Sequence, residues 1–295
     1  MVVMLIATFK EGFASFDFLK KIIGIKNMKL EKYIEVNCNS QIWRLLINKN
    51  DYLLIETRDA EKKEVFFSVL DLQSKKIFMN NFQFDEKFWL GIDGFYDNII
   101  FFHNFPKPDL PAHNEIIAFD ILSKEIVWHN QQLAFLFVFE DVVYTYQQGF
   151  DGKLFFSVDS KSGNTIKQLT DSEFSRIQNE QRIEEDEKYF EYKFPEELSK
   201  LSAINYFDIA EEKVIGNLQS IDLENYILVS YNKELAAGKY SNIFRVFQKE
   251  NKAEIFSRVL DADLDKLALD TFFVYKDLLF LIVEKKVLEI FRLEK

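Results

Sequence analysis

The sequence predicts an all-β protein, a β-propeller of about six four-stranded blades, with five or seven blades as alternatives. A phrase recurs in which a hydrophobic strand ends in Asp, a short polar turn follows, and a second strand begins. The Asp falls at the same point of four copies, at Asp71, Asp120, Asp159 and Asp208. Their spacings of 49, 39 and 49 residues fit the period of propeller blades, and no helical pattern separates the strands.

The first repeat predicts how one blade is built. β-branched and aromatic runs flank an Asn-Lys-Asn-Asp turn, as in a β-hairpin, and the first Asp phrase adds two further strands. The four strands are expected at 42–47, 52–58, 64–71 and 75–80. The same order restarts near Phe88 and again near Leu133. In each unit the Asp can cap the backbone of the turn that follows it, so we interpret the four Asp residues as structural rather than catalytic.

The last unit has only three predicted strands, between Leu267 and Arg292. Residues 32–36, at the other end of the chain, are expected to supply the fourth strand, because termini that share a blade protect both sheet edges. Residues 30–295 then form a single domain. Residues 1–29 are interpreted as an N-terminal extension that is either disordered or not native, with Met28 as an alternative start to Met1.

A charged insertion at 170–201 interrupts the fourth unit. Thr170-Asp-Ser-Glu173 matches a capping box and predicts a short helix that begins there. Pro195-Glu-Glu-Leu198 suits a helical turn with Pro in its first position. We expect this stretch to form an irregular blade.

Composition limits the function classes. The chain has 295 residues and a formal net charge of −11, and it contains no Lys/Arg-rich block, so nucleic-acid binding is disfavoured. The lone Cys38 permits no internal disulfide and favours a reducing, cytoplasmic location. No apolar run approaches the ~18 residues of a membrane span. No nucleotide or metal motif is present, so no cofactor is expected.

The phrase that ends at Trp128 resembles the repeat of quinoprotein-type and WD40-like propellers. The segments that start at Ile42, Phe88 and Pro108 together resemble a family of uncharacterised bacterial proteins with a propeller-like fold. This resemblance implies an architecture and no activity. Quinone-dependent dehydrogenases of this type carry a vicinal Cys pair, which this chain lacks.

Two groups of residues are candidate interaction sites. The long loop of the second unit could hold an acid/base or metal site, and an acidic run in the insertion could dock a basic partner. These residues are His103, Asp109 and His113 in the loop, and Glu184, Glu185, Asp186 and Glu187 in the insertion. Ordinary loop residues and a solvated charge run are the competing interpretations.

Two further patterns are interpreted as structural. Asp261, Asp263 and Asp265 have the alternate spacing of a calcium loop, but Lys266 and Phe272 occupy the positions that need Gly and Glu. A solvated loop between blades is therefore expected there. The apolar runs around Trp43, Trp89 and Trp128 predict that these indoles lie in the core.

The function favoured by the sequence is a non-catalytic binding or scaffold propeller, monomeric, with an unknown protein or small-molecule ligand. The repeats are intact, while no convergent catalytic set is found. The alternative is a propeller hydrolase or lyase acting on a small or carbohydrate substrate. Its site would lie at the mouth of the central channel, where loops from several blades converge.

Overall fold

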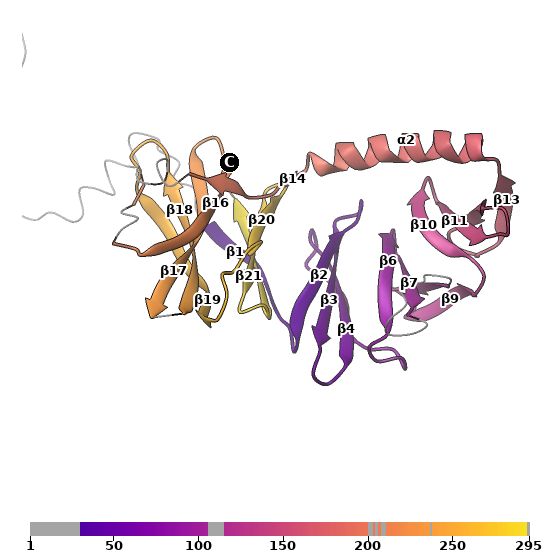
Figure 1. Ribbon diagram of the computed structural model, residues 1–295, viewed down its shortest axis with the longest axis horizontal. Coiled ribbons are helices and arrows are strands. Elements are labelled where there is room, and N and C mark those ends of the chain that lie inside the picture. The colour runs from indigo at the N-terminus through magenta and orange to yellow at the C-terminus, as the bar shows by residue number, and fades with distance from the viewer. Residues whose placement is uncertain are drawn as a thin grey trace, which may run out of the picture.

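The computed structural model describes residues 30–105, 115–199, 203, 206–207, 211–236 and 238–293. Within this part the protein is almost entirely β, with five antiparallel sheets and one long helix, which confirms the predicted class (Figure 1). The predictions for residues 1–29, Asp109, His113 and Asp208 concern positions outside the described residues.

Three sheets follow one another along the chain, each with four strands in sequence order. Blade 1 contains β2 (Gln41–Ile47), β3 (Tyr52–Asp59), β4 (Glu64–Asp71) and β5 (Ile77–Phe82). Blade 2 contains β6 (Leu90–Tyr96), β7 (Ile99–Asn104), β8 (Ile116–Asp120) and β9 (Glu125–Asn130). Blade 3 contains β10 (Ala134–Phe139), β11 (Val142–Gln148), β12 (Lys153–Asp159) and β13 (Thr165–Leu169).

The other two sheets have five strands each. Blade 4 contains β15 (Glu196–Leu198), β16 (Val214–Asp222), β17 (Tyr226–Ala236), β18 (Lys239–Gln248) and β19 (Glu254–Leu264). Blade 5 contains β14 (Tyr192–Lys193), β20 (Phe272–Tyr275), β21 (Leu278–Val283), β22 (Val287–Leu293) and β1 (Leu30–Asn37). The described residues therefore form five blades, which is one of the alternatives and one fewer than the preferred count of six.

The termini share blade 5, as predicted. β1 pairs antiparallel with β22, from Leu30 opposite Leu293 to Asn37 opposite Val287. The N-terminal strand therefore occupies the outer edge of the sheet that the C-terminal strands build, and it covers the free edge of β22.

The predicted turn role of the repeated Asp is confirmed for three copies. Asp71 Oδ1 accepts from the backbone N–H groups of Gln73 and Ser74, at 2.8 and 3.2 Å. Asp120 and Asp159 cap the turns after β8 and β12 in the same way. Each carboxylate satisfies backbone donors that the tight turn leaves unpaired.

Side-chain alternation places a core on both faces of the middle blades. In β3, Leu53 and Ile55 pack toward blade 5, while Leu54 packs toward blade 2. In β7, Ile100 and Phe102 pack toward blade 1. Ile99 and Phe101, which alternate with them, pack toward blade 3. The spatial order is thus 4-5-1-2-3, and Figure 1 shows it as a curved row with blades 4 and 3 at its ends.

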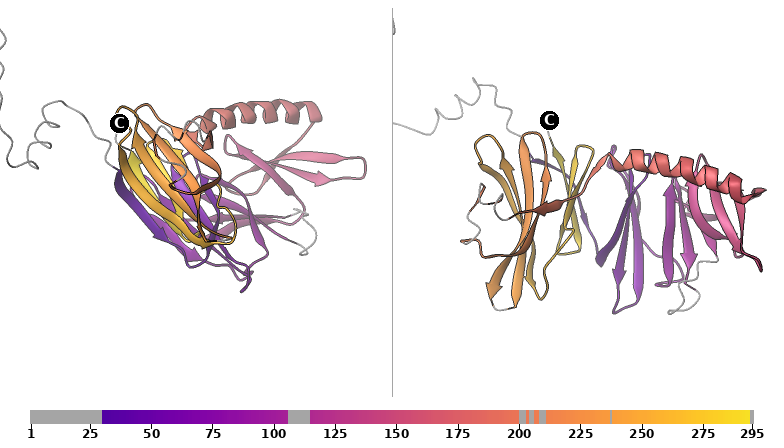
Figure 2. Two further views of the ribbon diagram at one scale, coloured as in Figure 1. Left: turned by 60° about the vertical axis from the view of Figure 1, so that its left-hand side comes forward. Right: turned by 45° about the horizontal axis from the view of Figure 1, so that its top comes forward.

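The helix α2 (Asp171–Tyr189) runs from blade 3, at one end of this row, to blade 5. Thr170 is its N-cap, and both halves of the predicted capping box are present. The helix has 19 residues, a length of about 28 Å at 1.5 Å per residue, so the prediction of a short helix was wrong in extent. Figures 1 and 2 show α2 running beside the sheets, from β13 to β14.

The insertion is therefore not an irregular blade. After α2, residues Glu196–Leu198 add a strand to blade 4 by pairing with β16, so the prediction of a helical turn at Pro195 was wrong. Ala203, Tyr206 and Phe207, from the region of the fourth Asp phrase, pack on the outer face of blade 4. The sixth blade was predicted because the insertion and the fourth Asp phrase were together counted as one blade.

Trp128 and Gly163 join blades 2 and 3. The Trp128 indole N–H donates to the carbonyl of Ser160 at 2.9 Å, and Gly163 lies in the β12–β13 turn beside that ring. Gly163 has φ +72°, and a Cβ built on it would lie 2.7 Å from Trp128 Cγ. Glycine is required here both for the left-handed backbone and for the close approach of the indole.

We expect Gly163→Ala to lower the free energy of unfolding by about 2–3 kcal/mol, from left-handed strain plus displacement of Trp128. Urea unfolding measures the change. Gly238→Ala is the matched control, because Gly238 has φ +77° and no atom within 4 Å of a built Cβ. Equal losses in the two variants would show that the contact with Trp128 does not matter.

Candidate functional site

His103 lies in β7 and is not exposed on a loop. It is 3% exposed, and its Nδ1 lies 2.8 Å from Asp93 Oδ1. The imidazole occupies space left by Gly91, where a Cβ would come within 2.5 Å of the ring. The prediction that His103 belongs to a surface interaction loop is therefore wrong, because its ring is packed within blade 2. Asp109 and His113, predicted to lie near it, are outside the described residues.

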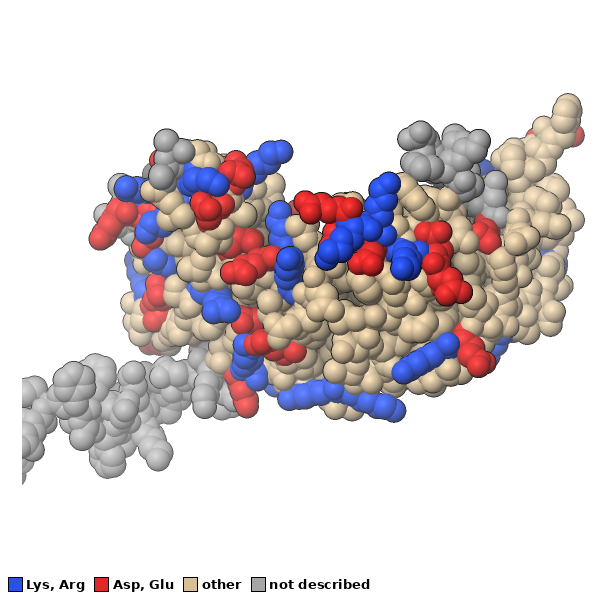
Figure 3. Space-filling model, turned by 90° about the horizontal axis from the view of Figure 1, so that it is seen from below, with Lys and Arg blue, Asp and Glu red and all other residues tan. Residues whose placement is uncertain are grey.

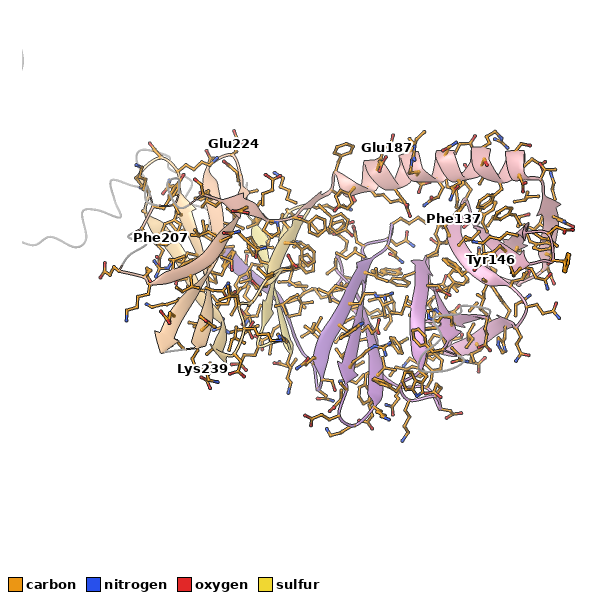
Figure 4. The ribbon with its side chains drawn as sticks, in the orientation of Figure 1. Phe137, Tyr146, Glu187, Phe207, Glu224 and Lys239 are labelled. Carbon is orange, nitrogen blue, oxygen red and sulfur yellow. The ribbon has the colours of Figure 1, made fainter. Side chains whose placement is uncertain are left out.

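The predicted acidic run lies on the last turns of α2. Glu184 forms an i,i+4 ion pair with Lys188 at 2.5 Å. Glu185, Asp186 and Glu187 are exposed, and within the described part of the chain none of them forms an ion pair. Figure 4 shows Glu187 at the end of the helix nearest to β14.

The whole helix is acidic. Between Asp171 and Tyr189 there are seven Asp or Glu and three Lys or Arg side chains, a net charge of −4. The opposite face of the molecule, seen in Figure 3, carries basic and acidic side chains interspersed. The whole chain is acidic, with a net charge of −11 over 295 residues, and α2 carries −4 of it in only 19 residues.

Two aromatic contacts anchor α2, one near each end. At its start, Phe174 stacks on Phe155 of blade 3, with ring centroids 3.9 Å apart, and lies 6.0 Å from Phe137 (Figure 4). At its end, the ring centroid of Tyr189 lies 5.4 Å from that of Phe194. The Phe194 ring in turn stacks on Phe273 of blade 5. These contacts fix the helix across the blades.

Between the anchors most of the helix is solvent-exposed. Only Phe174 and Gln181 are buried among its residues. Large apolar side chains near its end are exposed, among them Ile183 and Phe190, the latter 85% exposed. The helix therefore presents a surface with both carboxylates and apolar groups, and its own blades cover little of it.

A second feature is a cavity of about 450 Å³ at the junction of blades 4, 5 and 1. One wall is β2 of blade 1, and the opposite wall is the connection from β19 to β20. Its lining residues are Ile42, Trp43, Arg44, Leu45, Asp261, Leu267, Ala268, Leu269, Asp270, Thr271, Phe273, Ile282 and Lys285.

A buried polar network holds the wall formed by residues 267–271. Asn232 Nδ2 donates to the Ala268 carbonyl, and the Ala268 N–H donates back to Asn232 Oδ1, both at 3.0 Å. Asn242 Oδ1 accepts from the hydroxyls of Thr271 and Ser230, at 3.0 and 3.2 Å. Because buried polar groups are costly unless paired, this network fixes the wall in one position.

Asp261 departs from the predicted solvated loop. It is 5% exposed and lies where the pairing of β18 with β19 is irregular, opposite Asn242. Burial raises the pKa of its carboxyl; the charge of Lys285 acts in the opposite direction, and that of Glu284 raises the pKa further. β-Bulges often lie next to binding sites, where they redirect a side chain.

Trp43 also departs from prediction. Its indole is 65% exposed and lines the cavity, whereas Trp128 is buried as expected. The sequence analysis missed this cavity because its walls come from segments more than 200 residues apart. The acidic run at Asp261 was its only local signal, and that signal was interpreted as a solvated loop.

Comparisons with known proteins assign no function to this chain. A model described as a domain of unknown function, DUF4905, matches residues 47–128. This covers well under half of the chain, so membership of a particular family stays a prediction. No match was found among curated proteins.

Solved structures similar to this chain include one described as a propeller. A DUF4221 family member from Bacteroides vulgatus aligns with TM-score 0.34 and 9% identity, over 91% of this chain and 98% of that one. The Dos1 propeller aligns with TM-score 0.32 and 10% identity, over 90% and 76%. Hsv2p of Kluyveromyces lactis aligns with TM-score 0.29 and 13% identity, over 86% and 75%. Such values carry no functional inference.

No described helix has both the length and the apolar character needed to cross a membrane. The helix α2 is long enough, but its charged residues exclude it.

Proposed function

We propose that the protein is a non-catalytic binding scaffold, in which α2 docks a basic, partly apolar segment of a partner protein. The observation that supports this most is the helix itself. It is anchored at both ends by aromatic contacts, yet its middle and last turns are exposed and carry an excess of carboxylates. A helix built only for stability would bury a continuous apolar stripe.

The charge of α2 selects the partner class. Glu185, Asp186 and Glu187 are exposed and form no ion pair among the described residues, so their charge is open to solvent. Such a patch attracts Lys/Arg-rich segments and speeds their association. The exposed Ile183 and Phe190 beside the carboxylates would contact apolar side chains of the same segment.

A test uses two synthetic amphipathic peptides of equal length, one built from Leu and Lys and one from Leu and Glu. Fluorescence anisotropy at low and moderate salt measures their binding. We expect the basic peptide to bind and the acidic one not to bind. The triple variant Glu185→Gln, Asp186→Asn and Glu187→Gln is expected to weaken binding about tenfold, as for three exposed charge contacts of ~0.5 kcal/mol each.

The matched control removes three exposed carboxylates elsewhere, as Glu61→Gln, Glu224→Gln and Glu250→Gln. Figure 4 shows Glu224 on blade 4, away from α2. This control changes the net charge by the same amount and should keep the affinity. If both triple variants lose affinity equally, binding follows overall charge and the proposed docking on α2 is wrong.

The alternative of a hydrolase or lyase stays a prediction. Within the described residues, no observation favours it over binding.

A further inference from the structure

We propose that the cavity at the junction of blades 4, 5 and 1 binds a small organic cation, namely a primary amine carried on an apolar body. This site is separate from α2 and does not depend on the proposed docking there. It rests on one buried acid, an apolar rim, and a wall held in place by buried hydrogen bonds.

Asp261 supplies the anionic group. It is buried in the cavity wall, and among the described residues its carboxylate has no hydrogen-bond or ion-pair partner. A buried carboxylate without a partner is costly, and the raised pKa of Asp261 reflects that cost. An ammonium group supplies both the opposite charge and the N–H donors that the carboxylate lacks.

The rim supplies an apolar surface. Trp43 on β2 and Leu267 and Leu269 on the opposite wall are all exposed and all line the cavity. The Arg58 guanidinium already lies 5.9 Å from the centroid of the Trp43 ring, so the exposed part of the indole supplies apolar contact area. Together with the two leucines it can contact an apolar body. Exposed large apolar groups that gather at a cavity mouth are typical of ligand sites.

The wall is preorganised. The two hydrogen bonds between Asn232 and Ala268, and the contact of Thr271 with Asn242, hold residues 267–271 without a ligand. A site already in its binding geometry loses less conformational entropy when the ligand enters.

The basic residues of the lining do not favour an anion. Arg44 donates to the Ile92 carbonyl at 2.8 Å and lies 3.7 Å from the carboxylate of Glu56, which it shares with Arg58, so its charge is partly offset. Lys285 is exposed and forms no ion pair within the described residues, so its side chain can turn to solvent. Asp270 adds a second carboxylate at the rim.

The test compares three probes of the same shape: benzylamine, benzyl alcohol and benzoate. NMR titration of the full chain measures their dissociation constants. We expect benzylamine to bind about tenfold more tightly than benzyl alcohol, since a charge-assisted hydrogen bond is gained, and benzoate to bind most weakly. Asp261→Asn is expected to remove the advantage of benzylamine and to leave the affinity for benzyl alcohol unchanged.

Asp263→Asn is the matched control, because Asp263 lies on the same strand, is exposed, and does not line the cavity. It should leave all three affinities unchanged. Retained binding of benzyl alcohol to Asp261→Asn shows that the variant is folded. Tighter binding of benzoate than of benzylamine, an undiminished affinity of Asp261→Asn for benzylamine, or no saturable binding of any probe would each overturn the proposal.

Discussion

Replacing Glu56 with alanine is expected to lower the free energy of unfolding by about 3 kcal/mol, because it leaves two guanidinium groups without their carboxylate. Glu56 on β3 is 1% exposed, and its Oε1 accepts from Arg58 Nε at 2.6 Å. Arg44 Nε lies 3.7 Å from the other oxygen. Removal of one partner from a buried ion pair is far more costly than the pair's net contribution.

Loss of the Glu56 carboxylate should also weaken the contact between blades 1 and 2. Arg58 donates to the carbonyls of Phe88 and Leu90, at 3.1 and 2.7 Å, and Arg44 donates to that of Ile92. Glu56 thus orients the two arginines of blade 1 that bind the first strand of blade 2. Without Glu56, these hydrogen bonds are expected to loosen together, and the amides of β6 should exchange faster with solvent.

Urea unfolding gives the stability change, and hydrogen exchange gives its location. Glu61→Ala is the control, because Glu61 is exposed in the turn before β4 and should change stability by no more than about 0.5 kcal/mol. Similar losses in the two variants would mean that the buried carboxylate has no special role.

Phe174→Ala is expected to release α2 from blade 3 and to cost about 3 kcal/mol, as for other buried Phe side chains cut to Ala. Phe174 is one of two buried residues in the helix, and its ring stacks on Phe155 with an interplanar angle of 6°. Most of the stability of a helix in a protein comes from its tertiary packing. The amides of α2 should therefore lose protection while those of blade 1 keep it.

Phe190→Ala provides the comparison, because the Phe190 side chain is highly exposed at the other end of α2. It should change stability by no more than about 0.5 kcal/mol and leave α2 protected. If α2 remains protected in Phe174→Ala, the contact with Phe155 is not what anchors the helix.

Local features of the chain were predicted well, because their causes lie within a few residues. The strands of blade 1 were placed to within about two residues from β-branched and aromatic runs on either side of turn residues, and Asp71 was correctly interpreted as a turn cap. The capping box at Thr170 located the start of α2. The pairing of residues 32–36 with 287–293 followed from the need to protect a sheet edge.

The predictions that failed depended on residues far apart in sequence. His103 was expected on a loop, but it packs against Gly91 from the neighbouring strand. The length of α2 and its path from blade 3 to blade 5 depend on where Phe155 and Phe194 lie. The segment near Phe207 was counted as part of a blade because it carries the fourth copy of the Asp phrase, but it covers the outer face of blade 4.

The sequence by itself determined the all-β class, the repeated strand order, the Asp-capped turns and the shared terminal blade. Each of these follows from short-range sterics, from hydrogen bonding within a turn, or from a periodicity that any stacked sheet must satisfy. Tertiary structure alone decided that five blades form a row joined by α2, that Trp43 is exposed, and that Asp261 is buried. Burial is a property of what packs against a residue, and those neighbours lie in other blades.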